Sequence, residues 1–247
     1  MIKVGVLGAK GRMGAQVCAT VESAEGLELV ARVDLGDTLE PLSSADVVVD
    51  FTHPGAVMDN LRWCIEHDLN AVVGTSGFGD DRLAEVRGWL AGHRKARALI
   101  VPNFSVGAVL MMRFAEIAAP FFESAEVIEM HHAGKADAPS GTAGATATRM
   151  AAARGAAGLG AVPDATVTAA QGARGTQVDG LHVHSVRLAG LVAHQEVLLG
   201  GHGEVLTIRH DSLDRASFMP GVLRAVRGVT DLPGGLTVGL DGLLGLS

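Results

Sequence analysis

The most reactive stretch of the sequence lies between Glu129 and Thr142 and reads EMHHAGKADAPSGT. His131 and His132 end a strand-like run, so their side chains should point to opposite sides at first. Lys135 follows in a flexible segment. A histidine exchanges protons near neutral pH, and a lysine can donate a proton or hold a carboxylate. These residue types favour proton transfer to an anionic substrate, with a solvated histidine pair as the plainer alternative.

The same stretch ends at a predicted helix start, which adds an anion site. Ser140 is a good N-cap residue and is followed by Gly141 and Thr142. The unpaired N–H groups of a first helical turn, together with the Ser140 and Thr142 hydroxyl groups, can receive a carboxylate. Cations and a helix start in one short segment suit a small substrate that bears carboxylates.

A glycine loop, Gly8–Gly14, has the composition and context of a dinucleotide-binding turn. It reads GAKGRMG, follows a strand-like run and precedes a helix-like run. Glycines let the backbone approach a pyrophosphate, and the free N–H groups at the helix start bind its charge. Asp34 ends the second predicted strand 20 residues after Gly14, where a carboxylate would receive the ribose hydroxyl groups of NAD. A glycine-rich turn without a ligand is the plainer alternative.

The charges near this loop leave the choice of nicotinamide cofactor open. Asp34 should repel a 2′-phosphate and favour NADH, whereas Lys10 and Arg12 could offset that repulsion and admit NADPH. Two further segments, Gly74–Ser76 and Val101–Phe104, end the fourth and fifth predicted strands. Ligands of open α/β sheets bind at that edge, so these segments could line the nicotinamide side.

Alternating strand-like and helix-like runs position these groups in the first half of the chain. Nearly continuous apolar strands that alternate with helices indicate a parallel sheet covered on both faces. Strands are expected at 2–7, 27–33, 47–51, 71–73 and 99–101, and helices at 15–24, 56–67 and 80–91.

The second half has an α+β pattern. A long apolar helix is expected at 106–122, a strand at 127–132 and an Ala-rich helix up to about residue 154. Residues 157–179 are interpreted as a loop within this domain. Three strand-like runs follow at 181–188, 194–199 and 205–210, and their short Gly-containing links are typical of antiparallel connections. A helix at 213–227 and a strand at 236–238 complete the pattern.

Composition excludes several classes of protein. The 247 residues carry a net charge of −7 and include no Tyr, 7 Phe and 2 Trp. An acidic chain with few aromatic side chains lacks both the positive surface and the stacking platforms that bind nucleic acids. Cys18 and Cys64 match neither a metal-ligand spacing nor a disulfide framework, so a reducing compartment is the simpler interpretation. The sequence offers no signal peptide and no apolar stretch of the roughly 18 residues that a membrane span needs. We therefore expect a soluble, cytoplasmic protein.

Two other kinds of site are disfavoured by spacing. His182 and His184 fall on one face of a predicted strand, but no matching carboxylate or Cys spacing accompanies them, so we expect no metal. No G-x-S-x-G sequence is present, which argues against a serine hydrolase.

The glycine loop, the segments that end the predicted strands and the stretch from Glu129 to Thr142 together resemble the dihydrodipicolinate reductases, also called 4-hydroxy-tetrahydrodipicolinate reductases, of bacterial lysine and diaminopimelate synthesis. The resemblance covers essentially the whole chain, and the stretch from Glu129 to Thr142 is its most specific part. The short length and the Gly-Ala-Lys-Gly loop resemble the actinobacterial branch. The segments that carry the resemblance are 6–14, 50–54, 73–78, 103–107 and 129–142.

The resemblance implies a fold, an assembly and site residues. It implies a Rossmann-type domain of residues 1–104 completed by 214–247, and a substrate and tetramerisation domain of residues 105–213 with a mixed sheet. By motif position, His131 corresponds to the proton donor or acceptor and Lys135 to the proton donor. The substrate ligands would be His132, Ser140, Gly141 and Thr142. The cofactor contacts would be Gly8, Ala9, Lys10, Gly11, Arg12, Met13, Asp34, Gly74, Thr75, Ser76, Val101, Pro102, Asn103 and Phe104.

Two positions depart from the family pattern. Gly134 stands where many members carry a third histidine, which removes a polar group and loosens the loop that holds Lys135. Ser76 replaces a usual Thr and keeps the hydroxyl group. The first departure keeps open a reductase of another cyclic imine or keto acid. A protein that senses NAD(P)H without turnover is the alternative from another class.

Overall fold

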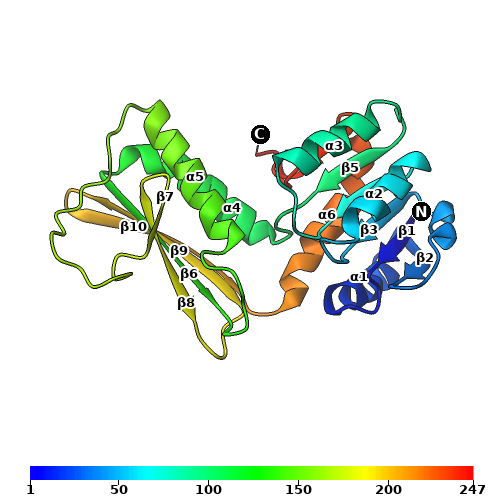
Figure 1. Ribbon diagram of the computed structural model, residues 1–247, viewed down its shortest axis with the longest axis horizontal. Helices are drawn as coiled ribbons and strands as arrows, with labels where there is room; N and C mark the ends of the chain where they lie inside the picture. Colours follow the sequence, from blue (N-terminus) through cyan, green and yellow to red (C-terminus); the bar gives the residue numbers. More distant parts are fainter. Residues whose placement is uncertain (247) are drawn as a thin grey trace. The chain divides into compact units, whose positions relative to one another are not determined.

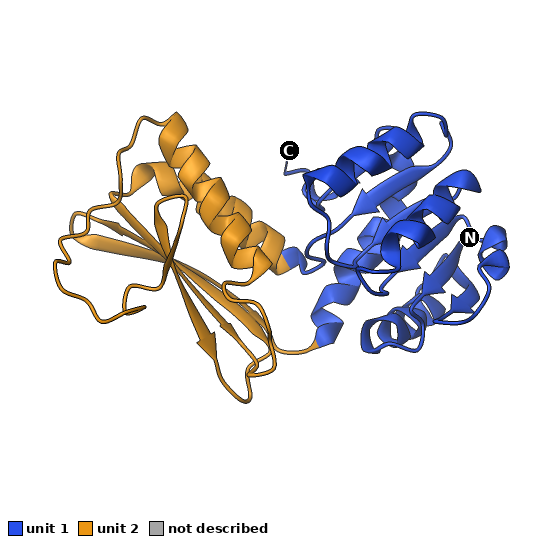
Figure 2. Ribbon diagram, in the orientation of Figure 1, with its two compact units in different colours: residues 1–106, 215–247 blue, residues 107–214 orange. Residues whose placement is uncertain are grey.

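The computed structural model describes residues 1–246, which form two compact units. Unit 1 combines Met1–Val106 with the chain from Arg215 onward, and unit 2 is Gly107–Asp214 (Figure 2). Within the described residues, no helix is long and apolar enough to cross a membrane.

Unit 1 is built on a six-stranded parallel sheet, as the alternating pattern predicts. Its strands lie in the order β11-β5-β4-β3-β1-β2. The central strands are buried and rich in Val and Ala, which is typical of a sheet covered on both faces. Strand β1 pairs with both β2 and β3, so the order of the strands reverses there and the carboxyl ends of the strands flank a crevice. The strands are β1 (Ile2–Leu7), β2 (Leu27–Val33), β3 (Val47–Asp50), β4 (Asn70–Val73), β5 (Arg97–Ile100) and β11 (Gly235–Val238).

Helices cover both faces of this sheet (Figure 1). Helix α1 packs against α6, and α2 packs against α3. In α2 the residues Val57, Leu61, Cys64 and Ile65 are buried, which is the apolar face that the 3.6-residue period predicts. The helices are α1 (Arg12–Ser23), α2 (Val57–Glu66), α3 (Asp80–Leu90) and α6 (Met219–Gly228). Short 3-10 helices are η1 (Glu40–Ser44), η3 (Arg215–Phe218), η4 (Val229–Asp231) and η5 (Gly242–Leu244).

Unit 2 is a five-stranded mixed sheet in the order β10-β9-β6-β8-β7. Strand β6 is parallel to β8 and antiparallel to β9. Small residues such as Ala115, Ala143 and Ala147 let the helices pack closely on the sheet residues Val127 and Val197. The strands are β6 (Ser124–His131), β7 (Thr176–Val178), β8 (Leu181–Arg187), β9 (Ala193–Gly201) and β10 (Glu204–Ser212). The helices are α4 (Val106–Ala118), η2 (Ala119–Phe121) and α5 (Gly141–Ala156).

The expected antiparallel pairing of the two strands at 181–188 and 194–199 is wrong, because β6 lies between them. With β6 between them, β8 and β9 lie two strand spacings apart, which is about 10 Å. The five residues that join β8 to β9 are long enough to bridge that distance. A short link therefore did not require a hairpin. The antiparallel pairing of β9 with β10 is confirmed.

Three other expectations on the second half differ from the structure. Residues 157–179 are not loop throughout, since β7 lies within them and pairs with β8. The helix expected at 106–122 ends at Ala118 and is followed by the 3-10 turn η2, which contains Pro120. A proline cannot donate the backbone hydrogen bond that would continue the α-helix. The helix expected from residue 213 begins as η3, and α6 starts only at Met219.

Candidate functional site

The glycine loop of unit 1 forms a turn whose backbone is held against β2. Gly8 has φ = +76°, a left-handed conformation that glycine adopts at low cost. The Gly8 and Ala9 N–H groups both donate to Val33 O, at 2.9 and 3.2 Å, and Gly11 N–H donates to Gly8 O at 2.9 Å. Helix α1 then begins at Arg12 without a side-chain cap at Gly11. Its first turn therefore presents backbone donors to a ligand.

Close packing between α1 and the loop explains the last glycine. A Cβ atom at Gly14 would lie 2.0 Å from Gly8 O and 3.0 Å from Ala9 Cα. Close packing of this kind is the role that the last glycine has in a dinucleotide-binding turn, so the loop fits a dinucleotide. Of the other predicted loop contacts, Lys10 and Arg12 are exposed and Met13 is partly buried.

Asp34 is fixed at the mouth of this loop by backbone donors. Its Oδ2 accepts from Lys10 N–H at 2.6 Å, and its Oδ1 accepts from Leu35 N–H at 2.8 Å. These hydrogen bonds lower the pKa of the Asp34 carboxyl below its ordinary value. A cavity of about 420 Å³ adjoins it, and its wall includes Gly8, Gly11, Asp34, Asp37, Thr52 and His53.

A buried carboxylate at the end of β3, which sequence reasoning did not single out, organises the neighbouring loops. Asp50 is only 3% exposed. Its Oδ1 accepts from Thr52 N–H at 2.9 Å, from Thr52 Oγ1 at 2.7 Å and from Thr75 Oγ1 at 2.6 Å. Its Oδ2 accepts from Asn60 Nδ2 at 2.9 Å. The signal was available, because Asp50 follows three consecutive valines at the carboxyl end of a buried strand.

The two remaining predicted cofactor segments lie at the same edge of the sheet. Thr75 Oγ1 accepts from Thr52 N–H at 2.8 Å, which joins Gly74–Ser76 to the loop after β3. Val101 N–H donates to Val73 O at 2.8 Å, so Val101–Phe104 follows beside it. The rings of Phe104 and Phe51 are 5.3 Å apart. These segments do not line the cavity next to Asp34. Of the predicted cofactor contacts, only Gly8, Gly11 and Asp34 line it.

In unit 2, a fully buried carboxylate lies directly behind His131. Glu129 and His131 are two residues apart in β6 and share one face of the strand. The Glu129 side chain is 0% exposed, and its Oε2 lies 2.5 Å from His131 Nδ1. Burial lowers the pKa of His131, the Glu129 charge opposes this, and the net direction is downward.

Arg187 on β8 completes this cluster. Its Nη1 and Nη2 donate to the two oxygens of Glu129 at 2.9 and 2.7 Å, and Nη2 also donates to Asp137 O at 2.6 Å. Burial would raise the pKa of Glu129, but hydrogen bonds from Arg187, Ser185 and His131 outweigh it and hold the pKa below its ordinary value. Neither Glu129 nor Arg187 was among the predicted site residues. The partner of Glu129 is 58 residues away in the sequence, so no local pattern pointed to it.

The predicted lysine lies in the loop that leaves β6. Lys135 N–H donates to His132 O at 3.1 Å, which closes a turn, and Lys135 Nζ donates to Asp137 Oδ1 at 2.7 Å. His132 is exposed, whereas the His131 side chain is only 14% exposed. The two histidines therefore differ in exposure, and β6 ends at His131, so that His132 already belongs to the loop.

The predicted anion site at the start of α5 is connected to the same carboxylate. Ser140 is the N-cap, and its Oγ accepts from Ala143 N–H at 3.2 Å. Ser140 N–H in turn donates to Glu129 Oε1 at 3.2 Å. Gly141 and Thr142 form the first turn of α5, where no acidic side chain is present to compete with an anionic ligand. The structure thus brings His131, Lys135 and Ser140–Thr142 into one loop region around Glu129.

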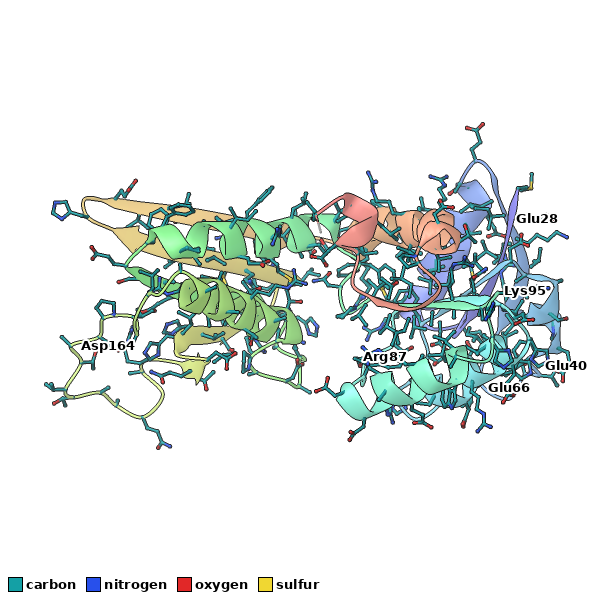
Figure 3. All side chains as sticks on the ribbon, turned by 90° about the horizontal axis from the view of Figure 1, so that it is seen from above. Glu28, Glu40, Glu66, Arg87, Lys95 and Asp164 are labelled. Atoms are coloured by element: carbon teal, nitrogen blue, oxygen red, sulfur yellow. The ribbon has the colours of Figure 1, made fainter. Side chains whose placement is uncertain are left out.

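His182 and His184 belong to a separate cluster. His184 Nε2 lies 2.7 Å from Glu126 Oε2, and His182 Nδ1 lies 2.6 Å from Arg174 O. Arg174 also pairs with Glu126 at 2.5 Å and with Asp164 at 3.2 Å. Asp164 lies in the loop that follows α5 (Figure 3). Among residues 1–246, no group of three or more His, Cys, Asp or Glu side chains could hold a metal ion.

Comparison with known proteins identifies the family from both halves of the chain. The family model described as "Dihydrodipicolinate reductase, N-terminus" matches residues 2–104, and "Dihydrodipicolinate reductase, C-terminus" matches residues 107–244. The chain belongs to the dihydrodipicolinate reductase family.

Relatives within the dihydrodipicolinate reductases match over the full length. A 4-hydroxy-tetrahydrodipicolinate reductase from Cutibacterium acnes is 65% identical over 246 residues, which covers 100% of both chains. One from Nocardia farcinica is 63% identical over 247 residues, or 99% of each chain. Both sources are actinobacteria, which confirms the actinobacterial resemblance. A dipicolinate-bound dihydrodipicolinate reductase from Paenisporosarcina sp. TG-14 has a TM-score of 0.85 at 37% identity, covering 98% of this chain and 99% of that one.

Proposed function

We propose that this protein reduces 4-hydroxy-tetrahydrodipicolinate (dihydrodipicolinate) to tetrahydrodipicolinate with a nicotinamide cofactor, in lysine and diaminopimelate biosynthesis. The observation that carries the proposal is full-length identity of 65% to a relative of that name. The overall reaction adds one hydride and one proton to the substrate and releases its 4-hydroxyl group as water.

Unit 1 is the proposed cofactor-binding unit. The glycine loop and the first turn of α1 would hold the pyrophosphate, and Asp34 would receive the ribose hydroxyl groups. Gly74–Ser76 and Val101–Phe104, at the carboxyl ends of β4 and β5, would line the nicotinamide side. An ionised Asp34 disfavours a 2′-phosphate, while the exposed Lys10 and Arg12 attract one. We therefore propose that NADH, NADPH or both serve as the cofactor.

Unit 2 is the proposed substrate-binding unit. The substrate carries two carboxylates, and the first turn of α5 with Ser140, Gly141 and Thr142 would receive one of them. His132 would be a second ligand. Lys135 would donate the proton, and His131 would take part in proton transfer as donor or acceptor. The bound nicotinamide supplies the hydride.

The assembly and location are proposed on separate grounds. We propose a homotetramer, supported by exposed apolar side chains on unit 2, where Phe121 is 81% and Val205 is 70% exposed.

We propose a cytoplasmic location, supported by the two free, buried thiols of Cys18 and Cys64, which suit a reducing compartment.

The test is oxidation of NADH and of NADPH by the purified protein with enzymatically generated substrate. Turnover with either cofactor supports the proposal, and its absence with both refutes it. A panel of other cyclic imines and keto acids tests the alternative that Gly134 leaves open. Tight NAD(P)H binding without turnover and without affinity for 2,6-pyridinedicarboxylate would instead indicate a sensor.

A further inference from the structure

We propose that Glu129 and Arg187 are a paired positioning device that keeps His131 as the neutral tautomer with Nδ1 donating, so that its Nε2 accepts a hydrogen bond at the substrate site. The inference rests on the proposed function and deepens it, because it divides the work between the two proton-transfer candidates. Lys135 is then the proton donor, and His131 is a hydrogen-bond acceptor.

The first argument is the saturation of the Glu129 carboxylate. Its Oε2 faces His131 Nδ1 at 2.5 Å and accepts from Arg187 Nη1 at 2.9 Å. Its Oε1 accepts from Arg187 Nη2 at 2.7 Å and from Ser140 N–H at 3.2 Å. An ionised carboxylate only accepts hydrogen bonds, so His131 Nδ1 must carry the proton. In a neutral ring, Nε2 is then left with a lone pair.

The second argument concerns the charges around His131. A buried carboxylate alone would draw a proton onto the imidazole, but Arg187 places a permanent positive charge on that same carboxylate. Lys135 in the following loop adds a second positive charge that lowers the pKa of His131. Strand β9 places the uncharged Ala193 opposite His131. Burial of the ring lowers the pKa of His131 most, and the positive charges of Lys135 and Arg187 lower it further. Together they outweigh the hydrogen bond and charge of Glu129, which raise the pKa, so the net shift is downward.

The third argument is that one guanidinium reaches both parts of the site. Arg187 Nη2 donates to Glu129 Oε1, behind His131, and to Asp137 O, in the loop that carries Lys135. Register places Arg187 directly opposite His131 in the parallel β6–β8 pair. The ion pair therefore fixes the ring and the loop together.

Removal of the two charges separately tests the proposal, because the expected shifts have opposite signs. The readouts are the pKa and tautomer of His131 by ¹⁵N NMR and the acidic limb of the pH profile of kcat/KM. Glu129→Gln removes the negative charge, so the pKa of His131 falls and the acidic limb moves to lower pH. Arg187→Gln leaves the negative charge uncompensated, so both move up by about one pH unit. Arg187→Lys restores the charge and should return both toward the wild-type values.

A charge-neutral double variant covers the case in which Arg187→Gln alone does not fold. The double variant Glu129→Gln, Arg187→Gln removes both charges. The pKa of His131 in this double variant should be higher than in Glu129→Gln and closer to the wild-type value. Glu126→Gln is the matched control, since Glu126 on the same strand also pairs with an Arg and a His, Arg174 and His184. It should leave the acidic limb unchanged.

The NMR titration separates this inference from the proposed function, because it needs no turnover. A wild-type protein that titrates as described but does not oxidise NAD(P)H refutes the proposed function alone. An Nε2–H tautomer in the wild type, or shifts of equal sign in the two single variants, overturns the inference whether or not the protein is active.

Discussion

The Asp34 carboxylate accepts a hydrogen bond from the Lys10 backbone N–H at 2.6 Å, which ties the end of β2 to the glycine loop. The contact does two things at once. It orders the loop by giving a backbone donor a partner, and it holds a negative charge beside the cavity that the loop lines. Under the proposed function, the choice of cofactor and the geometry of the loop both depend on the Asp34 side chain.

Replacement of Asp34 by Asn is expected to shift cofactor preference toward NADPH. The amide keeps an oxygen that can accept from Lys10 N–H, but it removes the charge that repels a 2′-phosphate. We expect the ratio of kcat/KM for NADPH to that for NADH to rise about tenfold. Asp46→Asn is the control, because Asp46 accepts from Lys3 N–H at the other end of β1, away from the cavity. An unchanged ratio in Asp34→Asn would contradict the role of the charge.

Gly14→Ala is expected to weaken cofactor binding and to destabilise the protein. The new Cβ would lie 2.0 Å from a backbone oxygen, so α1 and the loop must move apart. We expect a loss of about 1–3 kcal/mol in unfolding free energy and an increase in NADH Kd of about tenfold or more. Urea denaturation and calorimetry measure the two effects. Gly88→Ala in α3 is the control, since a Cβ there would meet no atom within 4 Å beyond its chain neighbours and the backbone of its own helix, and it should be neutral or slightly stabilising.

Lys135→Ala and His131→Ala should each reduce kcat under the proposed function. A group that transfers or directs a proton in the transition state contributes about 10²-fold or more, so losses of that size are expected in steady-state assays. Lys95→Ala serves as the control for loss of a lysine, because this residue is on the surface of unit 1 (Figure 3). Full kcat in both site variants would refute the assigned roles.

The thiol of Cys64 should make stability depend on pH at the alkaline end. Burial, with a contribution from the Asp50 charge, raises the pKa of Cys64 to about 12, above the ordinary value of 9.0. A folded-state pKa above the unfolded value means that the stabilisation is complete below pH 9 and is lost as pH rises toward 12. The unfolding free energy should thus decline above pH 9 by up to about 1.4 kcal/mol per pH unit.

Urea titrations between pH 8 and pH 10.5 measure this decline, and Cys64→Ala should remove its share of it. The thiol should also resist iodoacetamide in the folded protein and react only after denaturation, because Cys64 is 1% exposed. Equal alkaline slopes in the variant and the wild type would show that the thiol does not titrate between the two states.

Local patterns predicted the elements of unit 1 well, for a physical reason. Its strands are short, buried and joined by helices, so each βα step is readable from apolar runs and periodicity. The antiparallel pairing of β8 with β9 was wrong because sequence neighbours need not be spatial neighbours once β6 can lie between them. The extra strand β7 was hidden in a Gly-rich segment without an apolar run.

The sequence by itself determined the family, the glycine loop with its acidic partner, and the candidate proton-transfer groups, because these depend on short spacings. Only the tertiary structure decided what surrounds those groups. Parallel pairing of β6 with β8 places Arg187 opposite His131, and folding of the loop brings the Ser140 N–H to Glu129. The charge state of a histidine depends on burial and on charges a few ångströms away in space, and those charges lie up to 58 residues apart along the chain.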